Sequence, residues 1–316
     1  MRSAEELQQF YQQEIVPGLA DLEVLRKLQL KRVRFMWIAG FASLILGVAT
    51  LWPPMVLVFL LISLGIYFFI FGFKRSRPDF RTEYKKVVIS RLVKFMDPNL
   101  NYSANMYIPE AIYNSSKIFL QSPDIYKGED LVEGTLDKTQ LQFCELHTQD
   151  RRTDGKGRTY YVTIFKGLFF RADFNKEFHG QTYVLSDFGE RFMGFFGKMM
   201  QNMNMSRPDV VRLENPEFEK YFAVYSNDQV EARYILSTTF MERLVEFRKK
   251  TNAAVQLSFV NTQMNLALPM KQNLFEPSLR RTVMNYKDVV EYFEQLKFCT
   301  AIVDDLNLNT RIWTKQ

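Results

Sequence analysis

Few side chains in this sequence have the types and the spacing that catalysis or metal binding needs. The 316 residues include two histidines, His147 and His179, and two cysteines, Cys144 and Cys299. Zinc sites built from four cysteines, or from two cysteines and two histidines at the usual paired spacing, are therefore excluded. One disulfide would close a single long loop, so we expect two reduced thiols in a cytosolic domain.

A glycine-rich basic loop is the segment whose composition best suits phosphate. Residues 155–158 read GKGR and follow Arg151 and Arg152. A phosphate loop of the GxxxxGK[ST] type opens a helix, whereas these glycines connect two predicted strands, so we interpret them as a hairpin tip. The GxSxG and HExxH motifs of hydrolases are absent. We therefore assign no catalytic, metal-binding or cofactor-binding residues and expect no cofactor.

The longest uncharged run determines how the chain is organised. Residues 35–73 contain no Asp, Glu, Lys, Arg or His. As one helix rising about 1.5 Å per residue, this run would be about twice as long as a bilayer's hydrocarbon core is thick. The Trp-Pro-Pro sequence at 52–54 divides it, because a residue before proline is disfavoured in the α region. The sequence therefore predicts a transmembrane hairpin of two helices, 35–51 and 55–73.

Basic residues lie on both sides of the predicted hairpin, and its tip carries no charge. By the positive-inside rule we expect both termini to be cytoplasmic. The same side chains could instead contact anionic lipid, and both roles stay open. Because the hairpin has no ionisable group that could mark an ion or substrate path, we interpret it as an anchor. The nearest basic residues are Arg32 and Arg34 before the hairpin and Lys74, Arg75 and Arg77 after it.

An N-terminal helical segment is predicted over residues 3–33, with a break at Pro17-Gly18 and a direct continuation into the first membrane helix. Ser3 and Glu6 have the spacing of a capping box. A mainly one-sided apolar stripe must be covered either by the protein's own cytoplasmic domain, which we favour, or by a partner helix. The stripe consists of Leu19, Leu22, Val24, Leu25, Leu28 and Leu30.

From about Asp124 the apolar residues alternate or cluster as in β-strands. Asn227-Asp228 is predicted to form a hairpin turn. The predicted helices are Arg81–Met96, a helix from Ser237 or Thr238 through Phe247, and about Tyr286–Val303. The predicted strands are Leu136–His147, Thr159–Asp173, Gln181–Leu185, Phe218–Tyr225, Gln229–Leu236, Val255–Phe259 and Asn265–Leu268.

Runs of strands with separate helices indicate an α+β fold. We therefore predict a transmembrane helical hairpin followed by a cytoplasmic, mainly antiparallel β domain with flanking helices. The predicted parts are an N-terminal cytoplasmic amphipathic helix at 1–34, the two-helix transmembrane hairpin at 35–73, a juxtamembrane basic helical linker at 74–120 and the cytoplasmic α+β domain at 121–316.

One further predicted helix, residues 188–203, has a face rich in Phe and Met. These unbranched side chains make an adaptable apolar surface of the kind found at promiscuous binding sites. Three roles stay open for this face: part of the domain core, a docking surface for a partner, or a helix that lies on the membrane surface. The candidate interaction residues are Phe188, Phe192, Met193, Phe195, Phe196, Met199, Met200 and Met203.

Several segments resemble a bacterial family known only as a domain of unknown function. Members of that family are two-pass inner-membrane proteins whose genes often lie beside those of LemA-type proteins. The resemblance implies a bacterial inner-membrane location and a LemA-type partner, and it carries no established activity or catalytic residues. The similar segments are Phe165–Phe170, Ala172–Lys176, Gly180–Thr182, Val184–Asp187, Glu231–Leu236, Phe275–Pro277 and Asp305–Trp313.

Taken together, these features favour a non-enzymatic protein. We predict a membrane-anchored, cytoplasm-facing interaction or scaffold subunit of a membrane protein complex, whose partners are the lipid bilayer and either a second copy of the chain or another membrane protein. The alternative is a membrane-tethered enzyme or sensor for a lipid headgroup or nucleotide, which a concave cluster of Arg and carboxylate side chains would favour. We expect no nucleic-acid binding, because residues flanking the hairpin largely explain the net charge of +6.

Overall fold

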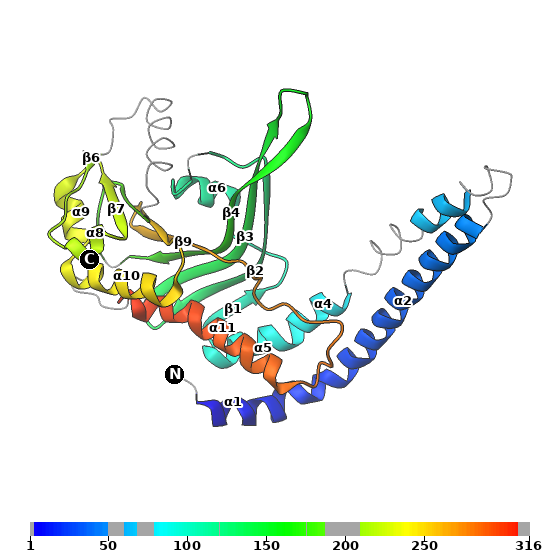
Figure 1. Ribbon diagram of the computed structural model, residues 1–316. Coiled ribbons are helices and arrows are strands. Elements are labelled where there is room, and N and C mark those ends of the chain that lie inside the picture. The colour runs from blue at the N-terminus through cyan, green and yellow to red at the C-terminus, as the bar shows by residue number, and fades with distance from the viewer. Residues whose placement is uncertain are drawn as a thin grey trace. The chain divides into compact units, whose positions relative to one another are not determined.

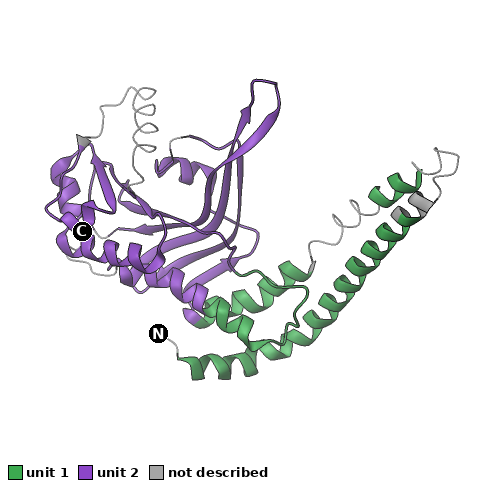
Figure 2. Ribbon diagram, viewed as in Figure 1, with its two compact units in different colours: residues 1–95, 275–293 green, residues 96–274, 294–316 purple. Residues whose placement is uncertain are grey.

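The computed structural model describes residues 3–49, 60–67, 79–119, 121–174, 176–186 and 209–308. The chain divides into two compact units, drawn in different colours in Figure 2. Unit 1 comprises residues 1–95 and 275–293, and unit 2 comprises residues 96–274 and 294–316. The described part of unit 1 is mainly helical, whereas unit 2 contains a β-sheet (Figure 1).

The N-terminal part of unit 1 is one uninterrupted helical segment. It consists of α1 (Ala4–Phe10), the π-helical turn η1 (Tyr11–Ile15) and α2 (Val16–Ala49). The capping box is confirmed, because Ser3 Oγ accepts the Glu6 N–H and Glu6 Oε2 accepts the Ser3 N–H.

The predicted break at Pro17-Gly18 is wrong. In the preceding π-helical turn the Val16 N–H donates to the carbonyl of Tyr11, five residues earlier. A proline ring clashes with the carbonyl four residues before it in a regular helix, and the wider turn relieves this crowding. The helix therefore passes through the proline and continues, as expected, into the uncharged run as far as Ala49.

A second helical segment of unit 1 follows the uncharged run. It consists of α4 (Asp79–Tyr84), η2 (Lys85–Ile89) and α5 (Ser90–Met96). This confirms the helix predicted at 81–96 and its end before Pro98. Lys85 is buried, and its Nζ lies 3.5 Å from Glu276 Oε1 in the 275–293 segment of the same unit. The two separate stretches of sequence that form unit 1 are thus joined by a buried lysine.

An ion pair at the start of α2 also ties this helix to residues 275–293. Arg26 donates to both oxygens of Glu23, at 2.6 and 2.9 Å, and its Nη1 donates to the carbonyl of Leu279 at 2.7 Å. Glu23 Oε2 also accepts the Val283 N–H at 3.1 Å. Because Glu23 and Arg26 are both largely shielded from solvent, this pair is less screened than a surface pair.

Replacing Glu23 by glutamine should remove part of the pH dependence of stability. The hydrogen bond from Arg26 is the main cause that lowers the pKa of Glu23 from 4.5 to about 2. A lowered carboxyl pKa adds stability that is complete above the unfolded pKa and declines as pH falls from about 4.5 towards about 2. We expect Glu23→Gln to be less stable near neutral pH and to lose less stability on acidification, as measured by denaturant unfolding. The exposed Glu242→Gln variant is the control, and equal acid sensitivity of the wild type and Glu23→Gln would contradict the assignment.

Unit 2 is built on an antiparallel sheet, which confirms the α+β class. In the described residues the strand order is β1-β2-β3-β4-β9-β8-β5-β7-β6, and every pairing is antiparallel. The strands are β1 (Leu100–Ser103), β2 (Ile125–Leu136), β3 (Thr139–Thr153), β4 (Thr159–Asp173), β5 (Thr182–Ser186), β6 (Asp209–Val210), β7 (Phe222–Ser226), β8 (Gln256–Val260) and β9 (Gln263–Pro269).

The helices that accompany this sheet are mostly short. Ser237 precedes α10 as its N-cap residue, and α11 matches the helix predicted from Tyr286. The helices are α6 (Glu110–Ser115), α8 (Pro216–Glu219), α9 (Gln229–Ile235), α10 (Thr238–Thr251) and α11 (Tyr286–Asp305), the last of which begins in residues of unit 1 and ends in residues of unit 2.

Two of the predicted strands are corrected by the structure. Residues 229–236 were expected to be a strand, but 229–235 form α9, because the Asp228 carboxylate accepts the N–H groups of Val230 and Glu231 and caps a helix. Asn227-Asp228 is therefore a helix start and not a hairpin turn. The strand predicted at 218–225 begins later, at Phe222, because Asn215 caps the short helix α8 before it.

A cluster of phenylalanine rings fills part of the core of unit 2. The Phe259 ring on β8 lies 4.9 Å from Phe174, 5.9 Å from Phe240 and 6.3 Å from Phe178, measured between ring centroids. All four side chains are buried, and most of these contacts are edge-to-face. In this geometry the electrostatic quadrupoles of the rings attract one another, and this attraction adds to the stability gained from burying apolar area.

Candidate functional site

The middle of α2 presents large apolar side chains to solvent. The exposed fractions are 71% for Phe35, 67% for Ile38, 59% for Phe41 and 65% for Ile45. Described residues 60–67 are also helical and expose further apolar side chains, including Leu60 and Tyr67. Single exposed apolar residues are normal, but a contiguous group of this kind marks an interaction surface.

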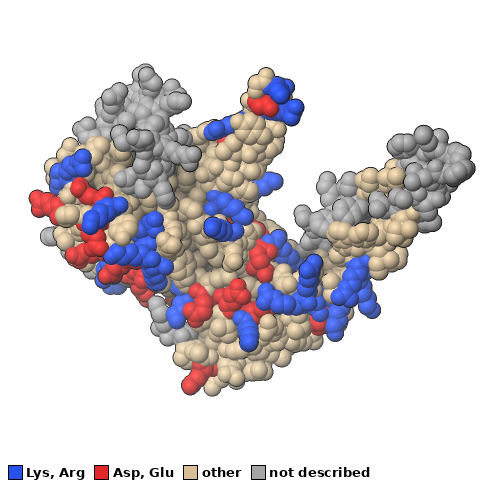
Figure 3. All heavy atoms as spheres, viewed as in Figure 1, with Lys and Arg blue, Asp and Glu red and all other residues tan. Residues whose placement is uncertain are grey.

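The exposed apolar section of α2 begins where its charged section ends. Lys31, Arg32 and Arg34 are exposed on the turns just before Phe35. Figure 3 shows this change along the helix labelled α2 in Figure 1, from charged atoms to a surface without them. Among the described residues, no helix combines the length and the apolar character that crossing a membrane requires. The predicted break at 52–54 and the basic residues Lys74, Arg75 and Arg77 lie outside the described residues.

The apolar stripe predicted at 19–30 is covered in part. Leu19 and Leu22 are buried, whereas Val24, Leu25 and Leu28 remain 57, 38 and 50% exposed. The candidate interaction helix at 188–203 lies outside the described residues, so its three possible roles stay predictions.

The basic loop at 155–158 is a hairpin tip, as predicted. Asp154 Oδ1 accepts the N–H groups of Lys156 at 2.9 Å and Arg158 at 2.8 Å, and the Asp154 carbonyl accepts the Gly157 N–H at 3.0 Å. Gly157 has φ of 77°, which glycine adopts without strain. The backbone N–H groups that a phosphate would need are therefore bonded within the turn.

A small polar pocket lies on one face of the sheet in unit 2. It has a volume of about 210 Å³, and its lining includes Lys127 on β2, His147 on β3, Lys166 on β4 and Asn273. Lys127 is directly opposite His147, and His147 is directly opposite Lys166, in the strand register. Three basic residues from three neighbouring strands thus form one row, which we call the basic row.

Burial and the two neighbouring lysines affect the protonation of His147. Partial burial is the largest cause that lowers the pKa of His147, followed by the charges of Lys166 and Lys127. Because the ordinary pKa is 6.5, the imidazole is mainly neutral at pH 7. A negative charge placed in the basic row would shift this equilibrium back towards the imidazolium ion.

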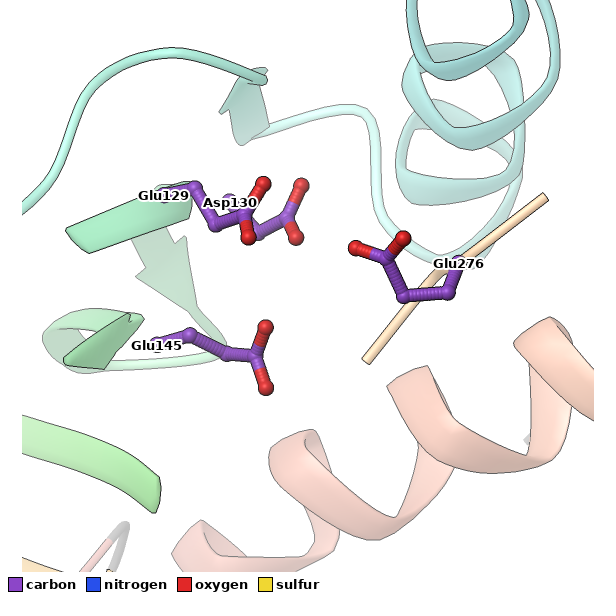
Figure 4. A group of neighbouring side chains, drawn as sticks. All are labelled: Glu129, Asp130, Glu145 and Glu276. Atoms are coloured by element: carbon purple, nitrogen blue, oxygen red, sulfur yellow. The ribbon is translucent and has the colours of Figure 1, made fainter. Parts of the chain in front are cut away.

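Carboxylates border the pocket two register pairs away from Lys127 and His147. Glu129 on β2 is opposite Glu145 on β3, and both line the pocket. The register shifts between Glu129 and Val132, where Asp130 has φ of 62°. At this β-bulge the carboxylates of Glu129 and Asp130 lie beside each other, and the Glu145 carboxylate lies near them on the neighbouring strand, as Figure 4 shows.

Among the described residues of unit 2, these three carboxylates form a group that could hold a metal ion. One oxygen from each lies within 4.8 Å of the others, and carboxylate oxygens suit Ca²⁺ or Mg²⁺. Two of the three groups already serve the fold. Asp130 accepts a hydrogen bond from the Tyr102 hydroxyl, and Glu145 Oε1 accepts the Leu274 N–H at 2.8 Å. The cluster therefore has a structural role that needs no ion.

A second pocket, of about 320 Å³, also contains basic side chains in unit 2. Lys176 Nζ donates to the carbonyls of Tyr234 and Ile235 at the end of α9. Arg243 Nη1 donates to the carbonyls of Asp304 at 2.9 Å and Asp305 at 3.3 Å, at the end of α11. Both cations thus cap helix C-termini, where positive charge is favourable, so a role in stability accounts for them.

The two cysteines are free thiols inside unit 2. Cys144 is buried and accepts the Ile108 N–H at 3.3 Å, and Cys299 is buried on α11. Burial raises the pKa of Cys144 to about 12 and also raises the pKa of Cys299. The thiolate is the nucleophile in cysteine chemistry, so neither side chain is suited to catalysis at neutral pH.

We expect both thiols to resist a maleimide reagent in the folded protein and to react fully after unfolding. The reason is that burial blocks access and keeps the thiol protonated. Intact mass spectrometry counts the modified sites. The matched control is Gly155→Cys at the exposed hairpin tip, which should react at once in the folded state. Rapid modification of Cys144 or Cys299 without unfolding would contradict the assignment.

Comparison with known protein families gives a match to part of the chain. Residues 163–308 match the family described as a protein of unknown function (DUF3137), so a domain of this kind is found in that part of the chain. The match includes Lys166 of the basic row and the helices α9, α10 and α11. The expected resemblance to an uncharacterised family is thus supported for this region, which lies outside the predicted hairpin. Neither the curated proteins nor the solved structures give a significant match to the chain.

Proposed function

We propose that this protein is a membrane-anchored interaction or scaffold subunit of a bacterial inner-membrane complex, with both termini in the cytoplasm. The observation that carries the proposal is the exposure of Phe35, Ile38, Phe41 and Ile45 on a helix section without charge. Burying each such side chain is worth about 1.5–3 kcal/mol. A bilayer would bury these residues on every side of the helix at once.

The charges around this section support the same proposal. Arg32 and Arg34 are exposed directly before the apolar section, and Lys74, Arg75 and Arg77 follow the uncharged run in the sequence. This arrangement suits two membrane helices, 35–51 and 55–73, that return the chain to the side on which it started. The helical conformation of residues 60–67 agrees with the second of these helices.

The part of the chain outside the anchor serves, in this proposal, to bind a protein partner. The partner is a second copy of the chain or another membrane protein, and the family resemblance suggests a LemA-type protein. The proposed contact is the Phe- and Met-rich face at 188–203, whose side chains would suit an adaptable apolar interface.

Crosslinking of the tagged full chain in native membranes, followed by pull-down and mass spectrometry, tests the scaffold role. We expect specific crosslinks to one membrane protein or to a second copy, and their loss in the Phe192→Glu, Met199→Glu double variant, because two charges would enter an apolar contact. Lys198→Glu, on the polar side of the same predicted helix, is the matched control.

Thermal unfolding of the same variants separates binding from folding. A folded double variant that keeps every crosslink would contradict the proposed contact. An unfolded double variant would assign the 188–203 face to the domain core, since charge buried in a core destabilises by several kcal/mol.

A further inference from the structure

The basic row places a lysine on each side of His147. Lys127, His147 and Lys166 are directly opposite one another on β2, β3 and β4. Directly opposed residues in a sheet have Cβ atoms about 5 Å apart, and like charges at this distance destabilise the pairing. All three side chains line the same 210 Å³ pocket, so a ligand of opposite charge would relieve the repulsion between the two lysines and a protonated His147.

We propose that this pocket binds a compact oxyanion of the phosphate-monoester class between Lys127, His147 and Lys166. The proposal goes beyond the anchoring and scaffold role and does not depend on it. A phosphate group offers three terminal acceptor oxygens, and the basic row offers donors from three different strands. Charge-assisted hydrogen bonds of this kind are the strong ones in proteins.

The border of the pocket sets the size and charge of its ligand. The carboxylates of Glu129 and Glu145 lie two register pairs away from Lys127 and His147, on the same face of the sheet, and line the same pocket. They would repel a second anionic group, so a nucleic-acid backbone or a polyphosphate fits poorly. A single phosphate on a small neutral or cationic body fits both the volume and the charge pattern. A free phosphate ester and a phospholipid headgroup share this chemistry.

His147 makes the binding depend on pH. The charged groups that face it are Lys127 and Glu129 from β2, Lys166 from β4 and Glu145 on its own strand. A bound anion stabilises the imidazolium form, so by linkage protonation of His147 strengthens anion binding. Affinity should therefore rise as pH falls through the pKa of His147. The pocket would respond to both anion concentration and acidity.

Calorimetric titration of the purified full chain with inorganic phosphate tests the site. We expect a dissociation constant of about 1 mM or tighter for the wild type, and a loss of about tenfold or more in the Lys127→Gln, Lys166→Gln double variant. The control is Lys156→Gln with Lys220→Gln, two exposed lysines outside the pocket that give the same change in net charge. Absence of phosphate binding by the wild type, or an equal loss in the control, would overturn the proposal.

Sulfate separates the titration of His147 from that of the ligand, because sulfate keeps its charge between about pH 5 and 8. The chain has two histidines, so carbon-13 NMR of labelled histidine resolves them. We expect sulfate to raise the pKa of His147. His147→Gln should bind sulfate with an affinity that no longer depends on pH in this range. An unchanged His147 signal at saturating sulfate would overturn the proposed position of the anion.

Two further ligands distinguish the sources of the phosphate group. Tighter binding of dihexanoyl phosphatidic acid than of glycerol phosphate would support the proposal with a lipid headgroup as the ligand. Equal binding would support it with a free phosphate ester. A polyanionic RNA that displaces both ligands, and whose binding is lost in the double variant, would overturn the proposal in favour of nucleic acid.

Discussion

Replacing Phe41 and Ile45 by lysine is expected to release the full-length protein from bacterial membranes. Both side chains lie in the uncharged section of α2 and are 59 and 65% exposed, so the substitutions cost the fold of the chain itself little. Each lysine near the centre of a membrane helix costs about 2.5–3.5 kcal/mol of insertion free energy. Alkaline carbonate extraction and immunoblotting measure the released fraction.

The matched control places the same change earlier on the same helix. Val24 and Leu28 are also exposed, but they precede the uncharged run. The Val24→Lys, Leu28→Lys variant should therefore stay in the membrane fraction. Equal release of both double variants, or retention of the Phe41 and Ile45 variant, would contradict an anchor at this section.

Phe259→Ala is expected to cause one of the largest losses of stability in the chain. Phe259 is completely buried on β8, and its ring contacts Phe174, Phe178 and Phe240. Removing a buried ring costs about 3–5 kcal/mol, from lost apolar transfer and from the cavity that remains. Denaturant unfolding of the full chain measures the change in midpoint.

Tyr161→Ala is the control for this prediction. Tyr161 lies on β4, just after the hairpin tip, and is 51% exposed, so we expect a change within about 0.5 kcal/mol. A comparable loss in the two variants would show that the phenylalanine cluster is not a main source of stability in unit 2.

Local signals in the sequence predicted much of the fold. The capping box at Ser3, the hairpin tip at Gly157 and the start of α10 after Ser237 are each specified by a few neighbouring residues. The misassigned segment at 229–235 carries such a signal too. Asp228 suits a turn and also caps a helix. The spacing of the apolar residues that follow is compatible with a helix as well as with a strand.

The candidate pocket could not be predicted in the same way. Lys127, His147 and Lys166 are far apart in the sequence, and only the register of β2, β3 and β4 brings them together. That register depends on a bulge at Asp130, a residue with positive φ that is not glycine. Asp adopts positive φ more readily than most residues, but the residue pattern around Asp130 does not specify a bulge, because packing with the neighbouring strands sets it.

Topology reporters test whether a membrane hairpin anchors the chain with both termini in the cytoplasm. A reporter active only in the cytoplasm and one active only in the periplasm would each be fused at Met1, at Pro53 and at Gln316 of the full chain. We expect cytoplasmic signals at Met1 and Gln316 and a periplasmic signal at Pro53, because basic residues lie on both sides of the uncharged run. A periplasmic signal at Gln316, or a cytoplasmic signal at Pro53, would contradict it.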